Sequence, residues 1–387
     1  MRILIIWAES ITKPGAGTTH CLGLVRGLQS LGHDVTVLAP HYADQEWTRR
    51  GMPVRPLRLP RKSLWSFLFL QFMVVFRTAW WTIRYRPEVI YVRTCFFQGV
   101  MAVISRIFGV PLVGEVDGLV DQEILARGQP HWMASLVRGL DRVNNRLSSG
   151  LVCVSEGLRR EMICRGARSE TAWTLHNGAM TDIMRPADRA TSRENLGLPE
   201  DRILIGFAGS FTPWQGLDFL VEAIAIAQQQ LRGKALVLLM GRGEVEDAIR
   251  EQARVQGVEN LIQFLPMATQ ERVAEFLNAC DACVIPIHHA CKLGLCSPLK
   301  FWDSISVGLP VIVAQGLEVE DVLAELGLPG VFDPNCPESL ADALVALIPI
   351  ARQSYAQRMA VHQMVQQRYS WQAVSARAAE LFSRLLH

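Results

Sequence analysis

The chain has 387 residues, of which 50% are hydrophobic and 20% charged, with 39 basic and 37 acidic side chains. This composition excludes a disordered chain, and at about 150 residues per domain the length predicts two or three domains. A net charge of +2 argues against nucleic-acid binding through a global positive field.

The first part of the chain alternates short apolar segments with helical patterns. An apolar segment at Ile3–Trp7 is followed by a Gly-Ala-Gly turn, by apolar residues at helical spacing, and by a second apolar segment at Asp34–Ala39. A strand, a glycine turn, a helix and a strand open a doubly wound α/β unit, so we predict one such domain over 1–180. Its later strands are expected at Val89–Val92, Pro111–Gly114, Gly150–Val154 and Trp173–Leu175.

A basic segment with an apolar centre interrupts this alternation. Between Arg49 and Arg93 the sequence has ten basic residues and one acidic residue, so the segment carries +9 and the rest of the chain −7. Inside it, 64–81 is apolar and aromatic at all but four positions. The basic flanks and Arg77 favour a helix that lies in the headgroup plane of a membrane. We predict peripheral membrane contact through about 61–86; the alternative is a buried helix of an ordinary domain.

The start of the chain and its cysteines bear on location and metals. The apolar run before Glu9 is too short for the core of a secretory signal, which predicts a cytoplasmic protein. Together with the membrane contact predicted for 61–86, this predicts a location on the inner face of the plasma membrane.

The nine cysteines lack framework spacing and fit reduced thiols. Six residues have a spacing that suggests zinc: Cys280, Cys283, His288, His289, Cys291 and Cys296. The first two stand in apolar segments that explain them as buried thiols, so we expect no metal site.

A second α/β series follows a polar, turn-rich stretch at 180–200, which we predict to be the linker. This second domain is expected over 200–368, and two helical segments divided at Ser370 close the chain. Its strands are expected at Ile203–Ala208, Ala235–Met240, Leu261–Leu265, Ala282–Ile285, Val311–Val313 and Gly330–Phe332. Because ligands bind at the carboxyl ends of parallel strands, two such domains predict a ligand in the cleft between them.

The glycine turn near the start of the chain is a weak candidate for anion binding. Gly15 and Gly17 precede a helix whose amides could receive an anion, or they simply make a tight turn. The third glycine of the dinucleotide fingerprint is absent, and so is an acidic residue at the end of the second strand. A nicotinamide cofactor is therefore disfavoured.

Two turns of the second domain are stronger candidates. Gly209 and Ser210 follow a strand and lead through Gln215 to a helix, and Gly241 and Arg242 stand in the equivalent place after the next strand. The guanidinium of Arg242 could bridge two phosphate oxygens; the alternative is a surface arginine in a turn.

The most specific segment begins at Ser297. We predict that Ser297 caps a helix with Pro298 in its first position, so that the helix start and Lys300 in the first turn favour a phosphate. Asp303 follows on the same face, where a carboxylate could hold ribose hydroxyls. The alternative is that Ser297 and Asp303 only cap and solvate the helix.

With these motifs, nearly the whole chain resembles the retaining glycosyltransferases of family 4, which have the GT-B fold of two facing doubly wound, Rossmann-like domains. The resemblance rests on stretches such as "GAGTTHCLGLVRGLQSLGHDVTVLAP", "GFAGSFTPWQGLDFLVEAI", "LMGRGEVEDAIREQA" and "SPLKFWDSISVGLPVIV". It implies transfer of a sugar from a nucleoside diphosphate sugar to a glycan or lipid-linked acceptor, without a metal or cofactor, in the assembly of cell-surface polysaccharide or glycolipid. A GT-B nucleotide-sugar epimerase and a catalytically silent nucleotide-sugar binder remain as alternatives.

The resemblance also implies roles for individual residues. Asp303 would hold the ribose, Lys300 would meet the diphosphate, and the loop from Phe264 to Met267 would hold the base through its backbone. The final helix, about 371–387, would cross back onto the first domain. Expected donor contacts are Gly15, Gly17, Gly209, Ser210, Gln215, Gly241, Phe264, Leu265, Met267, Ser297, Leu299 and Asp303. Candidates for catalysis are Lys300 and Arg242, together with Glu115 and Asp117, which follow a first-domain strand near the expected acceptor; Asp117 with Gly118 could equally form a turn.

Three positions depart from the family pattern. Leu295 stands where the family has the first glutamate of an acidic pair, and Ser210 and Gln215 replace the arginine and lysine often found after the first strand of the second domain. Fewer positive charges are therefore expected around the diphosphate, which leaves more of that task to Lys300 and Arg242.

Overall fold

The computed structural model describes residues 1–12, 15–43, 51–93, 95–287, 295–328 and 330–386. The chain forms two compact units. Unit 1 comprises Met1–Gly178 and Trp371–His387, and unit 2 comprises Ala179–Ser370.

Unit 1 is built on a seven-stranded parallel sheet with the strand order β3-β2-β1-β4-β5-β6-β7. A strand lies at every position where the sequence predicts one. The strands are β1 (Arg2–Trp7), β2 (Asp34–Tyr42), β3 (Val54–Leu59), β4 (Val89–Arg93), β5 (Leu112–Val116), β6 (Gly150–Cys153) and β7 (Ala172–Thr174). The edge strand β3 was not predicted from the sequence. The central strands are buried on both faces, which explains their continuous apolar runs.

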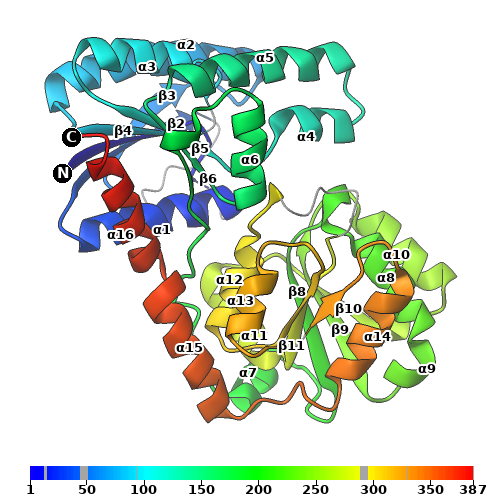
Figure 1. Cartoon of the computed structure of the whole chain (residues 1–387). Coiled ribbons are helices and arrows are strands. Elements are labelled where there is room, and N and C mark those ends of the chain that lie inside the picture. The colour runs from blue at the N-terminus through cyan, green and yellow to red at the C-terminus, as the bar shows by residue number, and fades with distance from the viewer. Residues whose placement is uncertain (13–14, 44–50, 94, 288–294, 329, 387) are drawn as a thin grey trace. The chain divides into compact units, whose positions relative to one another are not determined.

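Helices cover both faces of this sheet, with α2, α3 and α5 on one side and α1 and α16 on the other (Figure 1). They are α1 (Ala16–Ser30), α2 (Leu64–Tyr85), α3 (Gln98–Ile107), α4 (Val120–Ala126), α5 (His131–Leu147), α6 (Glu156–Cys164) and α16 (Trp371–Ser383). Close packing of α16 on α1 depends on two glycines one helical turn apart. A Cβ at Gly23 would lie 2.3 Å from the indole of Trp371, and a Cβ at Gly27 would lie 2.2 Å from Ser375 Oγ. The final helix therefore belongs to unit 1, where the resemblance placed it.

Helix α2 is only partly buried, so it is not the buried core helix of the alternative interpretation. Leu70 and Val74 pack into the apolar core of unit 1. In contrast, Trp65 is 80% exposed and Phe76 is 73% exposed. Among the described residues α2 holds one candidate membrane span by length and composition, Trp65–Tyr85, and 33% of its apolar window is buried inside the protein.

Unit 2 is built on a six-stranded parallel sheet with the order β10-β9-β8-β11-β12-β13. Every predicted strand of this unit is present. The strands are β8 (Ile203–Ser210), β9 (Ala235–Arg242), β10 (Ile262–Leu265), β11 (Ala282–Ile285), β12 (Val311–Ala314) and β13 (Val331–Phe332). The helices are α7 (Arg189–Leu196), α8 (Leu217–Ile226), α9 (Gln228–Leu231), α10 (Glu246–Val255), α11 (Gln270–Ala279), α12 (Leu299–Ser306), α13 (Glu320–Glu325), α14 (Pro337–Leu347) and α15 (Tyr355–Tyr369).

The stretch at 180–200 is not a linker, contrary to the prediction. It contains α7, which packs on α11 and belongs to unit 2. The physical reason is a buried ion pair: Arg193 Nη2 lies 2.5 Å from Asp281 Oδ2, and both side chains are almost fully buried. The units instead meet in sequence at Gly178–Ala179 and at Ser370–Trp371.

Candidate functional site

Lys300 stands at the carboxyl edge of the unit 2 sheet, in the first turn of α12. Its Nζ donates a hydrogen bond to Gln215 Oε1 and lies 4.3 Å from the centre of the Phe207 ring. Gly209 leaves room for it, because a Cβ there would lie 3.2 Å from Nζ. Three residues predicted separately, Lys300, Gln215 and Gly209, thus come together. Phe207 was missed, although its place on β8 two residues before Gly209 was a usable signal.

Within the part of the chain that the structure describes, the charged residues of α12 lack an ion-pair partner. Among the described carboxylates none forms an ion pair with Lys300, and none of the described cations pairs with Asp303. Burial lowers the pKa of Lys300 to about 7 and raises the pKa of Asp303 to about 7. A ligand that offers an anion to Lys300 and a hydroxyl to Asp303 would supply a counter-charge to the first and a hydrogen-bond donor to the second.

Ser297 does not cap α12, contrary to the prediction. The helix begins at Leu299, its capping position is Pro298, and no side chain caps it. Ser297 Oγ instead accepts a hydrogen bond from Trp302 Nε1 at 3.1 Å. Because Trp302 is fully buried and its indole N–H needs an acceptor, Ser297 fixes the helix start through the core.

The ends of β8 and β9 approach each other closely. Gly209 pairs with Gly241, and Ser210 with Arg242. A Cβ at Gly241 would lie 1.9 Å from Gly209 O, so only glycine fits there. The side chains of Ser210 and Arg242 are exposed, and Arg242 forms no ion pair with any described carboxylate. Arg242 is thus an exposed cation at this edge, and its contact with a phosphate stays a prediction.

The expected base-binding segment lies on the neighbouring strand. Phe264 and Leu265 belong to β10, which pairs with β9. Phe264 is partly buried, and the Arg250 guanidinium lies 3.8 Å from the centre of its ring. Met267 is 57% exposed in the loop that follows. The segment therefore offers backbone groups at the same edge of the sheet as Gly241.

Unit 1 carries a cluster of charged residues at the carboxyl ends of β4 and β5. His20 Nε2 lies 2.8 Å from Glu115 Oε1, and both side chains are buried. Arg93 forms an ion pair with Asp117, whose side chain is 38% exposed. The same Arg93 lies over the Trp7 ring, 4.4 Å from its centre. The sequence analysis proposed Glu115 and Asp117 but missed Arg93, although Arg93 directly follows the predicted strand at Val89–Val92.

This cluster holds its carboxylates in the charged form. Burial raises the pKa of Glu115 and Asp117, but His20 and Arg93 outweigh it, so that both pKa values lie below their usual range. Gly17 borders the cluster, because a Cβ there would lie 2.2 Å from Glu9 Oε2. The start of α1 at Ala16 therefore lies at the same edge of unit 1 as this cluster of charged residues.

The described residues contain no group of three or more potential metal ligands. Cys280 and Cys283 are buried as free thiols. Three members of the zinc alternative, His288, His289 and Cys291, lie outside the described residues.

Known structures share the fold of this chain. Sucrose-phosphate synthase from Thermosynechococcus elongatus matches with a TM-score of 0.78 and 14% identity, over 99% of this chain and 98% of that chain. Anabaena Alr3699/HepE in complex with UDP-glucose matches with a TM-score of 0.72 and 20% identity, over 99% and 100%. The two Rossmann-like units and these similarities define an α/β protein of the GT-B fold class, as the sequence predicted.

Sequence comparison identifies the family. Residues 15–178 match the model described as glycosyl transferase 4-like domain, and residues 202–349 match glycosyl transferases group 1. The chain belongs to glycosyltransferase family 4, of the group 1 type. A curated relative, D-inositol 3-phosphate glycosyltransferase 2 of Catenulispora acidiphila, is 26% identical over 290 residues, which are 72% of this chain and 66% of the relative. The matches cover 63 to 66% of the length of the first three such relatives.

Proposed function

We propose that the protein is a retaining glycosyltransferase that moves a sugar from a nucleoside diphosphate sugar to a glycan or lipid-linked acceptor. The observation that carries this proposal is that Lys300 and Asp303 on α12, beside the glycine-lined ends of β8 and β9, form no ion pair with a residue that the structure describes. Lys300 and Arg242 meet the diphosphate, Asp303 accepts hydrogen bonds from the ribose, and the segment from Phe264 to Met267 holds the base.

The transfer reaction is proposed to need no metal. The bond between the anomeric carbon and the diphosphate oxygen breaks, and its electron pair stays on the diphosphate, where Lys300 and Arg242 stabilise the growing negative charge. The acceptor oxygen attacks the anomeric carbon from the same face, and its proton passes to the departing phosphate oxygen. No side chain is required as a nucleophile in this scheme.

In unit 1 we propose different roles for the two acidic candidates. Asp117 is partly exposed and can contact the acceptor, whereas the side chain of Glu115 is 1% exposed and paired with His20. Glu115 is therefore a positioning residue, which orients His20 and does not touch the acceptor.

The acceptor proposal draws on the outer face of α2. The exposed residues of this face follow helical spacing, and we call them the α2 apolar face: Trp65, Phe69, Phe72, Phe76, Trp80 and Ile83. The buried face is partly polar: Thr78 Oγ1 donates to Val74 O at 2.7 Å, and Gln71 Oε1 accepts from Phe96 N at 2.9 Å. A helix with hydroxyl and amide groups inside and aromatic groups outside is suited to an apolar surrounding.

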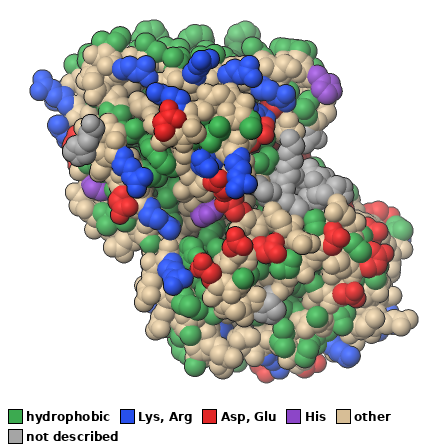
Figure 2. Space-filling view, viewed as in Figure 1, with side chains coloured by type: hydrophobic (Ala, Val, Ile, Leu, Met, Phe, Trp, Pro, Cys, Tyr) green, Lys and Arg blue, Asp and Glu red, His purple; other side chains and the backbone are tan. Residues whose placement is uncertain are grey.

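Figure 2 shows hydrophobic side chains gathered along the border of unit 1 where α2, α3 and α5 lie, with lysines and arginines next to them. We propose that this border lies on the cytoplasmic face of the plasma membrane and that the acceptor is lipid-linked. Replacing Phe72 and Phe76 by glutamine is expected to abolish binding to neutral phosphatidylcholine vesicles, measured by flotation. The matched variant Ile226→Gln/Val255→Gln, which changes exposed apolar residues of unit 2, should bind as the wild type does.

The experiment that tests the proposed reaction measures nucleotide release. The protein is incubated with uridine, guanosine or adenosine diphosphate sugars and a bacterial lipid extract, and the anomeric configuration of the product is read by NMR. Acceptor-dependent release with the configuration of the donor supports the proposal. Donor turnover without acceptor indicates an epimerase, and thermal stabilisation by the nucleotide without release indicates a silent binder.

Proton linkage gives an independent prediction for donor binding. Since each pKa is about 7, most Lys300 side chains are neutral at pH 8 and most Asp303 side chains are protonated at pH 6. A diphosphate favours charged Lys300, and a ribose hydroxyl favours charged Asp303. Binding is therefore expected to take up a proton at pH 8 and to release one at pH 6. Calorimetry in buffers of different ionisation enthalpy measures both.

Two variants test which side chain takes up the proton at pH 8 and which releases the proton at pH 6. Lys300→Met is expected to abolish the uptake at pH 8, and Asp303→Asn is expected to reduce the release at pH 6 to that of the nucleotide itself. Equal proton counts for the wild type and both variants would contradict the assignment.

A further inference from the structure

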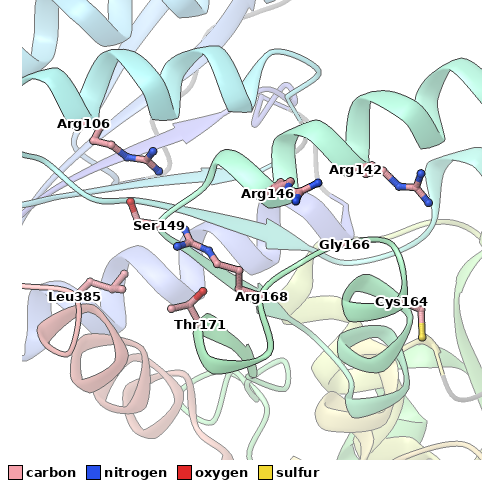
Figure 3. A pocket seen from close by; sticks show the side chains of 9 residues that line it. All are labelled: Arg106, Arg142, Arg146, Ser149, Cys164, Gly166, Arg168, Thr171 and Leu385. Carbon is pink, nitrogen blue, oxygen red and sulfur yellow. The ribbon is translucent and has the colours of Figure 1, made fainter.

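Unit 1 has a second polar site, at the opposite edge of its sheet from Glu115 and Asp117. It is an open pocket of about 940 Å³, beside the amino ends of β6 and β7. The hydroxyls of Ser149 and Thr171 line its wall. The wall also includes four arginines: Arg106, Arg142, Arg146 and Arg168. Figure 3 shows that these arginines come from α3, from α5 and from the loop after α6. We call them the arginine pocket.

Two of the guanidinium groups are held in place by backbone carbonyls. Arg106 Nη2 donates to Leu147 O at 2.7 Å, and Arg168 Nη2 donates to Ser148 O at 2.8 Å. These carbonyls lie at the end of α5, where the partial negative charge of the helix favours cations. Arg142 and Arg146 are one turn apart on the same helix. The site is therefore preorganised from three separate segments and still has N–H groups to offer.

The wall of the pocket is positively charged. No acidic residue lines it, and none of its four arginines forms an ion pair with a described carboxylate. Other arginines of this region are paired: Arg138 and Arg165 with Asp121, and Arg159 with Glu156. Four positive charges in one pocket compare with +2 for the whole chain. Guanidinium groups bind phosphate oxygens in a bidentate manner, so an anion with a phosphate group fits this site.

The surroundings of the pocket indicate which phosphate. Ile107 and Phe108 follow Arg106 at the end of α3, and Val143 follows Arg142; their exposed fractions are 76%, 47% and 53%. Cations beside exposed apolar side chains are typical of a surface at the level of lipid headgroups. We propose that the arginine pocket binds the phosphate of an anionic phospholipid headgroup, an inference that rests on the proposed membrane contact and adds a lipid preference to it.

Flotation with vesicles of two compositions tests this inference. Phosphatidylcholine alone is compared with a mixture that contains 30% phosphatidylglycerol, in about 0.15 M salt. The wild type is expected to prefer the anionic vesicles, and Arg142→Gln/Arg146→Gln should weaken binding to them roughly tenfold or more, with binding to neutral vesicles unchanged. Because neither side chain makes a hydrogen bond or ion pair with another described residue, the variant is expected to fold as the wild type does. Unchanged binding of this variant to anionic vesicles would overturn the inference.

The control removes equal charge outside the pocket and outside α2. Arg232→Gln/Lys234→Gln changes exposed basic residues of unit 2 and is expected to bind both vesicle types as the wild type does. Equal losses in the two variants would indicate a diffuse positive surface and overturn the specific site.

The remaining outcomes separate this inference from the membrane contact and from a soluble ligand. Binding to both vesicle types without preference overturns the headgroup site but leaves the membrane contact, whereas binding to neither overturns both. Thermal shift measurements with inorganic phosphate and pyrophosphate test whether the pocket binds a soluble anion. Stabilisation that is lost in Arg142→Gln/Arg146→Gln, without any vesicle preference, would assign the pocket to a soluble anion and overturn the lipid assignment.

Discussion

Lys300→Ala is expected to lower the rate of acceptor-dependent nucleotide release roughly ten- to a hundredfold, because the variant loses a charge-assisted contact with the diphosphate. The loss should be larger than in relatives that keep a lysine and an arginine after the first strand of this domain, since Ser210 and Gln215 supply no charge here. Initial rates at saturating and at low donor concentration measure the effect. A lower kcat shows that the contact strengthens in the transition state, and a higher KM alone shows that it serves ground-state binding.

Two comparisons make this prediction specific. Lys234→Ala removes an exposed lysine of the same unit and is expected to leave the rate unchanged. Lys300→Ala itself should not lower the melting temperature, because Lys300 pairs with no carboxylate that the structure describes and its burial already disfavours the charged form. Wild-type rates for Lys300→Ala would remove Lys300 from the proposed site.

The sheets were predictable because their strands are buried on both faces and therefore read as short continuous apolar runs. β3 was not predicted because it lacks such a run. Its sequence Val-Arg-Pro-Leu-Arg-Leu contains two arginines and Pro56, and it is not buried on both faces. Proline is tolerated only because β3 is an edge strand whose free side needs no partner. The position of an edge strand depends on the assembled sheet, which local sequence does not reveal.

The site was predictable where a motif sets local geometry and unpredictable where distant segments meet. The Ser-Pro-Leu-Lys segment placed Lys300 at a helix start, and the glycines placed Gly209 and Gly241 at strand ends. The contact between Lys300 and Phe207 joins positions 93 residues apart, and Arg93 meets Asp117 across two strands. Ser297 was assigned to capping because serine before proline is typical of helix starts, but the buried indole of Trp302 competes for the same oxygen.

The linker prediction failed because the buried partner of its arginines lies far along the chain. Polar residues and turns at 180–200 resemble a solvated connection, yet Arg193 donates to Ala279 O at 2.9 Å and pairs with Asp281, 88 residues later. Asp281 Oδ2 also accepts a hydrogen bond from Leu204 N at 2.8 Å, so it joins α7, β8 and β11. This fully buried carboxylate is thus a central contact between the segment and the rest of unit 2.

Asp281→Ala is accordingly expected to reduce the free energy of unfolding of unit 2 by about 3 to 5 kcal/mol, because it leaves the buried guanidinium of Arg193 without a counter-charge. The guanidinium of Arg189, 3.4 Å from Asp281 Oδ1, would lose the same partner. Since the chain has two compact units, hydrogen exchange followed by mass spectrometry in rising urea reads the loss in each unit separately. Peptides of α7 and β8 should lose protection, and peptides of unit 1 should keep it.

The neighbouring chemistry provides graded controls for this prediction. Asp281→Asn keeps the shape and one acceptor for Leu204 N, so its cost should fall between those of the wild type and Asp281→Ala. Glu251→Ala breaks an exposed ion pair with Arg254 and is expected to leave unit 2 unchanged, because solvent already screens that pair. If Asp281→Ala were as stable as Glu251→Ala, the attachment of α7 would not depend on the buried charge but on other contacts of the segment, such as the hydrogen bond from Ala187 N to Asn278 Oδ1 at 2.7 Å.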